Sequence, residues 1–414
     1  MNIALLGHGT VGSGVAEVFF KNRASLERKA GQELDLKYIL DLRDFPDLPY
    51  ADRFVKDFNL IANDDSVKVV AEVIGGLEPA YTFTKTCLKH GKSVVTSNKE
   101  LVAQHGAELL QIARENHVNY FFEASVGGGI PIIRPLHMCL AANRIEEIAG
   151  ILNGTTNFIL TKMIREKMSF EDALALAQKL GYAERNPAAD VEGQDACRKI
   201  CILAALAFGE HVYPKDVPTE GITKVTLEDV AYADDLDCVI KLIGRAKRDE
   251  NSTKISAMVA PALIHRESQL GTVDDVFNAI LVRGDATGDV VFYGKGAGKL
   301  PTASAVMGDI IDCAKSSDTS PSLRWKTSNG GNVEEKGKNE TAVYLRCQSD
   351  MANLPQEAES LFGKLQMLNR DNQPANEFAF ITPVLTEQEI DTAVAKLEGM
   401  GVKFLGKIRV LDYE

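Results

Sequence analysis

The chain has 414 residues, 45% of them hydrophobic and 25% charged, a composition typical of a globular protein with room for two or three domains. Its formal net charge of −12 argues against nucleic acid as a partner, because an acidic surface repels phosphates. Apolar runs stay shorter than the roughly 18 residues that span a bilayer. The N-terminus, "MNIALLGHG", has no basic stretch and no small-residue cleavage site. We therefore expect a cytoplasmic protein that contacts no membrane.

The seven cysteines are scattered, and no two of them form a CxxC pair. This spacing argues against a disulfide framework and against a zinc ribbon. Cys197 and Cys201 stand four residues apart in one helical pattern, and we expect both to be small core residues.

Residues 1–130 alternate between short apolar runs and helical patterns. Strands that alternate with helices pair in parallel through right-handed crossovers, which predicts an α/β domain with a Rossmann-like, doubly wound sheet. A helix is expected after the glycine turn at 7–12, with others at 80–91 and 99–117. The expected strands are 2–6, 36–42, 68–76, 92–98 and 118–126.

The pattern changes after Pro131, which predicts a second, α+β domain over 131–300 with a sheet of its own. Strands are expected at 254–264 and within 277–298. Residues 200–209 are apolar on every side, as in a buried helix. We expect 222–247 to be helical in its second half, and a helix at 301–316 to pack back on the first domain.

Residues 317–338 are rich in Ser, Asn, Gly, Lys and Glu, which is typical of a linker. Beyond it, 339–414 is expected to form a small α+β module. Its apolar runs at 341–348, 377–383 and 402–412 and its helical pattern at 386–400 support this interpretation.

The motif "GHGTVG" follows the first strand and opens a helix. Gly7 permits the tight turn, Gly9 lets the backbone approach a pyrophosphate, and Gly12 lets helix and strand pack closely. A purely structural turn is the alternative, but the run of strands and helices around the motif favours a dinucleotide. Thr10, Val11, Gly75 and Thr96 are expected to complete the site.

The end of the second strand offers both Asp41 and Arg43. An acidic residue there grips the ribose hydroxyls of NAD, whereas an arginine accepts the 2′-phosphate of NADP, so the pair alone leaves both cofactors open. Lys99 follows the fourth strand, at the edge where ligands of an open α/β sheet bind. It is expected to face cofactor and substrate, with a plain first-turn lysine as the alternative.

Asp195 and Lys199 are four residues apart and share one face of a helix that continues as the apolar run 200–209. A charge pair beside a buried segment is costly unless it is paired or used, and burial lowers the pKa of lysine into a range that suits proton transfer. Glu184, Asp190 and Glu192 lie in the loop before this helix, where carboxylates can meet the ammonium of an amino acid. The alternative is a solvated loop with a surface pair.

The stretch "EASVGGGIP" joins the two domains and combines Glu123 with glycine carbonyls, oxygen ligands of the kind that hard cations take. A glycine-rich hinge is the equal alternative. The stretch "NGTTNFIL", from Asn153 to Leu160, carries helix-capping residues that could also hold a carboxylate.

Together these stretches resemble the homoserine dehydrogenase family. The resemblance rests on "GHGTVG", "TSNKELVA", "EASVGGGIPIIRPL", "ILNGTTNFIL", "LGYAERNPAADVEGQDACRKICILA" and "GKGAGKLPTASAVMGDI", in the family's order and over about residues 1–320. It implies NAD(P)-dependent interconversion of L-aspartate 4-semialdehyde and L-homoserine. It also implies a Rossmann-like domain, a substrate and dimerisation domain, a C-terminal ACT domain, and a homodimer or a dimer of dimers.

The resemblance also implies roles for individual residues. Lys199 is the proton donor, Lys99 the second lysine of the site, and Asp195 the residue that holds Lys199 or substrate. Arg43 matches a position used for the 2′-phosphate and favours NADP over NAD, and Gly298 approaches the nicotinamide. Substrate residues are Glu184, Asp190, Asp195, Asn153, Gly154, Thr155 and Thr156, and a monovalent cation, expected to be sodium, is held by Glu123, Val126, Gly128 and Ile130.

Two departures from the family pattern stand out. His8 occupies an apolar position, where a phosphate or solvent is expected to accommodate it. The Asp-x-Pro-Gly turn of ACT domains is absent, which argues against threonine feedback and favours a module that serves only dimer contacts.

Two other functions remain as alternatives. Another Rossmann dehydrogenase, acting on an amino-acid semialdehyde or a keto acid, is the second hypothesis. A regulator that senses nicotinamide or an amino acid is the third. Arg185, Glu192 and Arg198 receive no role and are expected to face solvent.

Overall fold

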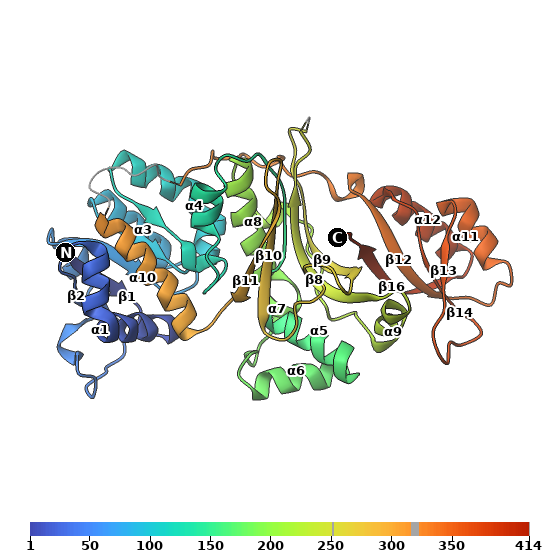
Figure 1. The fold of residues 1–414 in the computed structure, drawn as a ribbon, viewed down its shortest axis with the longest axis horizontal. Helices are drawn as coiled ribbons and strands as arrows, with labels where there is room; N and C mark the ends of the chain where they lie inside the picture. The colour runs from blue at the N-terminus through green and yellow to red at the C-terminus, as the bar shows by residue number, and fades with distance from the viewer. Residues whose placement is uncertain (251, 316–322, 414) are drawn as a thin grey trace.

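A computed structural model describes residues 1–250, 252–315 and 323–413. Three bodies lie in a row along the long axis of Figure 1: an N-terminal body in blue and cyan, a central body around long strands, and a C-terminal body in orange and red. The active-site candidates all fall in the first two bodies.

The N-terminal body contains a six-stranded parallel sheet in the order β3-β2-β1-β4-β5-β6. The order reverses between β1 and β4, so the carboxyl ends of these strands form the crevice where such sheets bind ligands. The predicted doubly wound sheet is confirmed. The strands are β1 (Asn2–Leu6), β2 (Asp35–Leu40), β3 (Phe54–Val55), β4 (Val67–Glu72), β5 (Ser93–Thr96) and β6 (Tyr120–Phe121).

The predicted strand 118–126 is wrong beyond Phe121, because the chain turns around the buried side chain of Glu123. The Glu123 carboxylate accepts hydrogen bonds from the backbone N–H groups of Ile132, Ile133 and Arg134 at 2.6, 2.9 and 2.8 Å. These bonds hold the glycine-containing turn at 127–129 in place of a continued strand.

Helices cover both faces of this sheet, and one of them arrives from much later in the chain. Helix α10 lies against α1, where a Cβ on Gly14 would come within 2.8 Å of the Lys299 carbonyl oxygen, so the approach requires glycine. In Figure 1 α10 appears in orange among the blue elements. The helices are α1 (Thr10–Ala30), α2 (Asn59–Ala62), α3 (Ala80–Lys89), α4 (Lys99–Glu115) and α10 (Lys299–Lys315).

A ten-stranded mixed sheet runs through the central and C-terminal bodies in the order β11-β10-β7-β8-β9-β16-β12-β14-β13, with β15 paired to β12. The central strands are β7 (Ile145–Ile151), β8 (Cys238–Lys247), β9 (Ser256–His265), β10 (Phe277–Gly284) and β11 (Gly288–Lys295). The C-terminal strands are β12 (Glu340–Gln348), β13 (Gln366–Leu368), β14 (Glu377–Ile381), β15 (Leu385–Thr386) and β16 (Lys403–Val410).

The helical prediction for the second half of 222–247 is wrong, since those residues form β8. Residues 239–244 are buried without interruption, because β8 lies between β7 and β9 and is covered on both faces. A strand buried on both faces loses the polar alternation that distinguishes a strand from a buried helix. The helix in this stretch is α9, over Leu227–Asp235.

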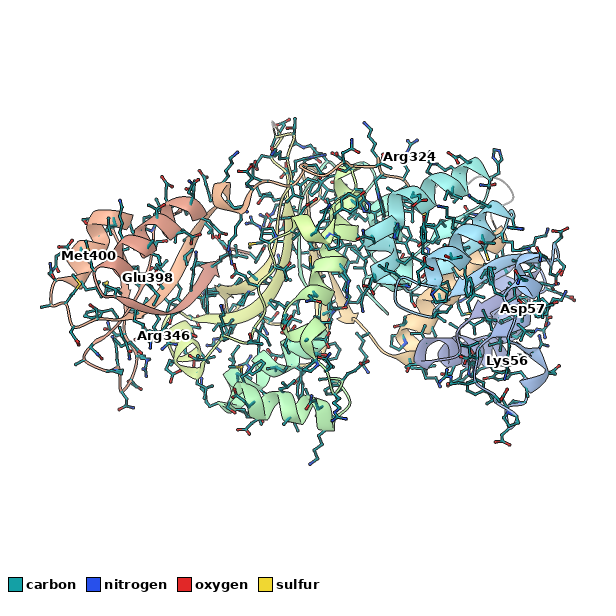
Figure 2. All side chains as sticks on the ribbon, turned by 180° about the vertical axis from the view of Figure 1, so that it is seen from behind. Lys56, Asp57, Arg324, Arg346, Glu398 and Met400 are labelled. Carbon is teal, nitrogen blue, oxygen red and sulfur yellow. The ribbon has the colours of Figure 1, made fainter. Side chains whose placement is uncertain are left out.

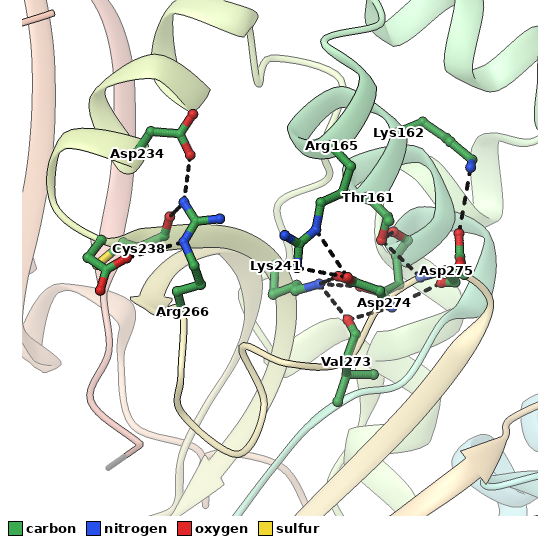
Figure 3. A network of polar contacts seen from close by, with 12 residues as sticks. Thr161, Lys162, Arg165, Asp234, Cys238, Lys241, Arg266, Val273, Asp274 and Asp275 are labelled. Carbon is green, nitrogen blue, oxygen red and sulfur yellow. Dashed lines mark hydrogen bonds and ion pairs between the residues drawn. The ribbon is translucent and has the colours of Figure 1, made fainter.

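The central helices pack on this sheet. They are α5 (Gly154–Glu166), α6 (Phe170–Lys179), α7 (Ala188–Val191) and α8 (Gln194–Phe208), and the burial of Cys197 and Cys201 on α8 confirms that prediction. Figure 3 shows how this region is tied together: the buried Lys241 ammonium of β8 donates to the Val273 carbonyl at 2.5 Å and to the Asp274 carboxylate at 3.2 Å. The same ammonium donates to the side-chain oxygen of Asn157 on α5 at 3.2 Å, which ties α5 to the sheet. The network fixes α5, the helix whose N-cap residue is Asn153.

Apart from the two-residue strand β15, the C-terminal body has the order strand, helix, strand, strand, helix, strand, with α11 (Leu354–Phe362) and α12 (Glu387–Gly399). Its last strand joins the central sheet in parallel, where Arg409 pairs with Ala262 and Val410 with Leu263. The buried Arg409 guanidinium binds Glu387 of its own body and Glu220 of the central body.

Of the predicted linker, residues 317–322 lie outside the described residues, and 323–338 are packed on the protein. Trp325 is only 4% exposed, because the apolar side chains Leu323, Trp325 and Val333 interrupt the polar composition and bury. Short 3₁₀ or π turns lie at Ala51–Arg53, Glu123–Ser125, Pro135–Cys139, Pro214–Asp216 and Lys336–Lys338. Within the described ranges, no helix has the length and apolar character to cross a membrane.

Replacing Arg409 with alanine is expected to destabilise the junction of the central and C-terminal bodies. The change leaves the buried Glu387 carboxylate, 2% exposed, without its main partner, and losing one member of a buried pair costs about 3–5 kcal/mol. Calorimetry should show a Tm about 5–10 °C lower. Lys403→Ala, an exposed change on the same strand, is the control and should leave Tm unchanged, and equal shifts in both variants would contradict this account.

Candidate active site

The centre of the candidate site is a buried carboxylate held between two lysines from different bodies. Asp195 accepts from the Lys99 ammonium at 2.7 Å on Oδ1 and from the Lys199 ammonium at 2.8 Å on Oδ2. Asp195 and Lys199 are 5% and 6% exposed, whereas Lys99 reaches in from α4 and is partly exposed. We refer to these three residues as the lysine–aspartate bridge.

Lys99 is placed by the capping of α4 at the end of β5. The Asn98 side chain accepts from the Leu101 N–H at 3.1 Å and donates to the Gly76 carbonyl at 2.6 Å. The hydroxyl of Thr96 donates to the buried Glu72 carboxylate on the neighbouring strand at 2.7 Å, and accepts from the Asn98 N–H at 2.9 Å. Two strand ends and a helix start are therefore locked together beneath Lys99.

Asp195 and Lys199 lie one turn apart on α8, and the apolar remainder of this helix anchors them. Ile200 and Leu203 are fully buried in the core that α8 shares with β7 and β8. The Lys199 ammonium also donates to the Leu152 carbonyl at 2.7 Å, at the end of β7. One of its protons therefore remains free of these two protein partners.

The electrostatics of the bridge favour a charged aspartate and a readily deprotonated lysine. Burial lowers the pKa of Lys199; the Asp195 charge opposes this, and the Lys99 charge adds to it. Burial alone would raise the pKa of Asp195, but the two ammonium groups hold it well below its ordinary value. Burial would also lower the pKa of Lys99, but the attraction of Asp195 outweighs it and the pKa is raised. Of the two lysines, Lys199 therefore loses its proton more readily than Lys99.

Asn153 connects the bridge to a second carboxylate. Its amide donates to Asp190 at 2.7 Å and to Asp195 at 2.9 Å, while its oxygen accepts from the Thr156 N–H at 2.9 Å and caps α5. Burial raises the pKa of Asp190, and the nearby Asp195 charge raises it further. Two carboxylates therefore approach each other through one amide, which favours a cationic group beside Asp190.

Of the other predicted substrate residues, Gly154, Thr155 and Thr156 follow Asn153 at the start of α5, whereas Glu184 lies on a separate loop. Gly154 begins α5, and a Cβ there would lie 2.7 Å from the Val276 carbonyl oxygen. The Thr155 hydroxyl donates to the Tyr182 carbonyl at 2.7 Å, and the Thr156 hydroxyl donates back to Asn153. Glu184 is exposed on the loop that Thr155 ties down, so the structure does not bring its carboxylate into the bridge.

Arg198 departs from the solvent-facing prediction. It is half-buried and donates to Glu100 of α4 at 3.0 Å, an ion pair between the N-terminal and central bodies. Helix geometry explains this, since Arg198 lies three residues after Asp195 and shares the face of α8 that meets Lys99 and Glu100 at the start of α4. Arg185 and Glu192 are exposed, as predicted.

The glycine motif has the geometry of a dinucleotide turn. Gly7 has a φ of +97°, and a Cβ on Gly12 would lie 2.0 Å from the Gly7 carbonyl oxygen, so both positions require glycine. A Cβ on Gly9 would meet nothing within 4 Å, which leaves space where a ligand approaches the backbone. Thr10 and Val11 form the first turn of α1, whose free N–H groups favour an anion.

His8 is enclosed by protein, so the expectation that solvent accommodates it is wrong. It is 6% exposed, with the rings of Phe45 and Phe54 centred 4.7 and 5.0 Å away and the Tyr50 hydroxyl 3.2 Å from Nε2. Burial lowers the pKa of His8. An aromatic pocket of this kind holds a neutral imidazole where an apolar residue was expected.

Asp41 and Arg43 bind each other at the end of β2. The guanidinium donates to Asp41 Oδ1 at 3.0 Å and Oδ2 at 2.9 Å, and also to the His8 carbonyl at 3.0 Å. Asp41 accepts the His8 N–H at 2.8 Å as well. The arginine side chain is still 61% exposed, so it presents charge to a ligand while the carboxylate is already occupied.

The other predicted site residues lie outside the bridge. Gly75 and Gly298 are exposed turn residues with φ of +87° and +127°, after β4 and before α10. The predicted cation set, Glu123, Val126, Gly128 and Ile130, lies in the turn between the two bodies. Its carboxylate faces backbone N–H groups and the Arg134 guanidinium, which also pairs with the buried Asp309.

Sequence reasoning missed Glu72 and Asn98. Glu72 is fully buried, burial raises its pKa, and it binds the Thr96 hydroxyl and the Ile74 N–H. An acidic residue inside the otherwise apolar strand "KVVAEVIGG" was the available signal for it. Asn98 is an N-cap in "TSNK", and such a residue before a helix is a recognisable signal.

Comparison with known proteins agrees with this geometry. A family model described as "Homoserine dehydrogenase, NAD binding domain" matches residues 7–123, and one described as "Homoserine dehydrogenase" matches residues 131–311. A homoserine dehydrogenase of Neisseria gonorrhoeae is 39% identical, over 97% of this chain and 95% of its own length.

Solved structures agree as well. A homoserine dehydrogenase of Thiobacillus denitrificans superposes with a TM-score of 0.91 at 36% identity, over 100% of this chain and 99% of the other. A hyperthermophilic archaeal homoserine dehydrogenase mutant in complex with NADPH gives 0.64 at 30% identity, over 75% of this chain and 97% of its own. The chain belongs to the homoserine dehydrogenase family.

Proposed function

We propose that this chain catalyses the reaction of its family, the NAD(P)-dependent interconversion of L-homoserine and L-aspartate 4-semialdehyde, as an oxidoreductase that acts on a CH–OH group. The observation that carries the proposal is the lysine–aspartate bridge. It places a buried lysine of lowered pKa where the carboxyl edge of the N-terminal sheet meets the central body. A substrate bound there lies beside any dinucleotide on the glycine turn.

The residues present fit a dinucleotide, because Gly9 leaves space beside the backbone and the first turn of α1 offers N–H groups. Bound nicotinamide supplies or accepts the hydride. Lys199 holds the proton at the substrate oxygen and donates it as the aldehyde becomes an alcohol, or takes it in the reverse direction. Asp195 orients Lys199 and keeps it charged, and Lys99 neutralises Asp195 from the cofactor side.

The amino-acid end of the substrate is assigned to the Asn153 region. Asp190, with a raised pKa from burial and the Asp195 charge, gains most from a cationic neighbour, so we assign the substrate ammonium to Asp190 and to Glu184 on the exposed loop. Asn153, Gly154, Thr155 and Thr156, at the start of α5, line the pocket, where a helix N-terminus favours the substrate carboxylate.

For the cofactor, we propose NADP in preference to NAD. Arg43 is exposed and held in place by Asp41, whose oxygens already accept hydrogen bonds from Arg43 and His8, and that occupancy disfavours a ribose hydroxyl. The archaeal relative in complex with NADPH supports the same preference. Gly75, Thr96 and Gly298 are proposed to line the cofactor, Thr96 through its backbone since its hydroxyl binds Glu72.

We propose a monovalent cation, sodium, at the turn that carries Glu123. Within the described ranges, no hydrogen bond reaches the carbonyl oxygens of Val126, Gly128 or Ile130, and such oxygens suit a hard cation. Because the Glu123 carboxylate accepts three backbone N–H groups, its carbonyl is the better candidate ligand.

The remaining assignments follow from the family: a cytoplasmic homodimer or dimer of dimers, with a cofactor domain over 1–130, a substrate and dimerisation domain over 131–300, and an ACT-like domain over 339–414. The strand and helix order of the C-terminal body supports the last of these.

Replacing Lys199 with alanine removes the proposed proton donor. The kcat for homoserine oxidation, followed at 340 nm, is expected to fall by roughly 10²–10⁴, the contribution of a general acid or base. Lys179→Ala, an exposed lysine at the end of α6, is the matched control and should keep full activity. A loss of less than about threefold in Lys199→Ala would remove Lys199 from the mechanism.

Replacing Arg43 with alanine tests the cofactor preference. The kcat/KM for NADPH should fall by roughly tenfold or more, the worth of a charge-assisted hydrogen bond to the 2′-phosphate, while that for NADH changes little. Lys56→Ala, an exposed cation that follows β3 at the carboxyl edge of the same sheet and is labelled in Figure 2, should change neither value. If NADPH use in Arg43→Ala equals that of the wild type, Arg43 does not bind the phosphate.

A further inference from the structure

Trp325, the single tryptophan of the chain, lies in a segment that crosses from the N-terminal body to the central body. We refer to residues 323–333 as the strap. The Trp325 ring packs on α4, where a Cβ on Gly106 would lie 2.6 Å from the ring atom Cζ2. The centroids of the Trp325 and Phe122 rings are 5.6 Å apart. The contact with α4 therefore requires glycine at position 106.

The same segment is bonded to the end of α8. The Trp325 indole donates to Nδ1 of the buried His211 at 2.9 Å. The Lys326 N–H donates to the Gly209 carbonyl, and the His211 N–H donates to the Lys326 carbonyl, both at 2.9 Å. Further on, the Asn332 amide donates to the His211 carbonyl at 2.9 Å. Burial lowers the pKa of His211 to about 4, so the imidazole stays neutral and can accept from the indole at neutral pH.

The two helices held by the strap are the two that carry the lysine–aspartate bridge. Lys99 is the first residue of α4 and Asp195 the second residue of α8. Close to the bridge the helices are joined by the Glu100–Arg198 ion pair at 3.0 Å. Gly106 lies seven residues beyond Lys99, about 10 Å along the helix, so Trp325 joins α4 to the segment after α8 at a second, distant point.

We propose that Trp325 is a positioning residue, which acts through α4 and α8 to hold the Lys99 ammonium against the Asp195 carboxylate. The inference rests on the proposed function of the bridge. Two attachment points along a pair of helices fix their relative rotation, whereas one leaves a hinge. Loss of the distant point lets Lys99 withdraw from Asp195 and Lys199.

Withdrawal of Lys99 has a signature that simple destabilisation lacks. The Lys99 charge is one of the causes that lower the pKa of Lys199, after burial, so removing it raises that pKa. In the direction of aldehyde reduction Lys199 must be protonated, so activity is lost as pH rises through its pKa. The basic limb of the kcat/KM profile should therefore move to higher pH when the strap is loosened.

The test compares Trp325→Ala, Trp325→Phe and Arg324→Ala in the full chain, with kcat/KM for both substrates measured across pH. Trp325→Ala should lower kcat/KM by roughly tenfold to a hundredfold, the cost of misplacing catalytic groups by about 1 Å, and move the basic limb upward. Trp325→Phe keeps a ring against Gly106 and should recover most of the activity. Arg324, the neighbour of Trp325 in the chain, is exposed and is labelled in Figure 2, and its replacement should match the wild type.

A second variant approaches the contact from the other side. Gly106→Ala places a methyl group against the indole, while alanine improves the helix propensity of α4. Because Trp325 is the only tryptophan, its emission reports the displacement directly, and the same upward shift of the basic limb is expected.

A shifted tryptophan emission in Gly106→Ala shows that the indole has moved. If that variant and Trp325→Ala both keep the wild-type kcat/KM and pH profile, the positioning role is overturned while the proposed function stands. If the wild-type protein itself does not oxidise homoserine, the proposed function fails and the inference fails with it.

Discussion

A single buried carboxylate, Asp195, sets the requirement that the rest of the site meets. A charge of this kind, 5% exposed, is costly unless paired, and removing one partner of a buried pair costs about 3–5 kcal/mol. Its two ammonium partners come from different bodies of the protein, Lys199 from the same helix and Lys99 from the end of the cofactor sheet. The site is therefore complete only when the two bodies are held in register.

The surrounding structure meets that requirement with buried polar contacts between segments far apart in the chain. Glu72, Thr96 and Asn98 lock the strand ends beneath Lys99, and Asn153 ties Asp195 to Asp190 and to the start of α5. At the far side of the molecule Arg346 and Arg409 join the C-terminal body to the central one through Asp229 and Glu220. Buried ion pairs contribute little net stability compared with apolar packing, but an arrangement that separates the partners leaves a buried charge unpaired.

Much of the site was predictable from sequence because its signals are local. The structure reproduces two local geometries that the sequence predicts. One is the tight turn of the glycine motif "GHGTVG", and the other is the i, i+4 pair of Asp195 and Lys199 at the start of an apolar helix. The strand after Phe121 and the helix expected across β8 were wrong. In both cases a long-range contact decides the conformation: Glu123 binds a later turn, and β8 is covered on both faces.

The contacts between bodies were beyond prediction for the same reason. Nothing near Arg198 in the chain indicates Glu100, and nothing near Trp325 indicates Gly106 or His211, since those partners lie 98 to 219 residues away by chain position. The composition of 317–338 suggested a linker, because Ser, Asn and Gly outnumber the three apolar residues that bury in its described part.

The most direct test of the account is the pH dependence of kcat/KM for aldehyde reduction in Asp195→Asn, since the substitution keeps the shape of the side chain and removes its charge. The Asp195 charge favours the protonated form of Lys199, so its loss lowers the pKa of Lys199 further. The account predicts a slower enzyme whose basic limb moves to lower pH than in the wild type. A basic limb that stays in place, or moves to higher pH, would contradict it.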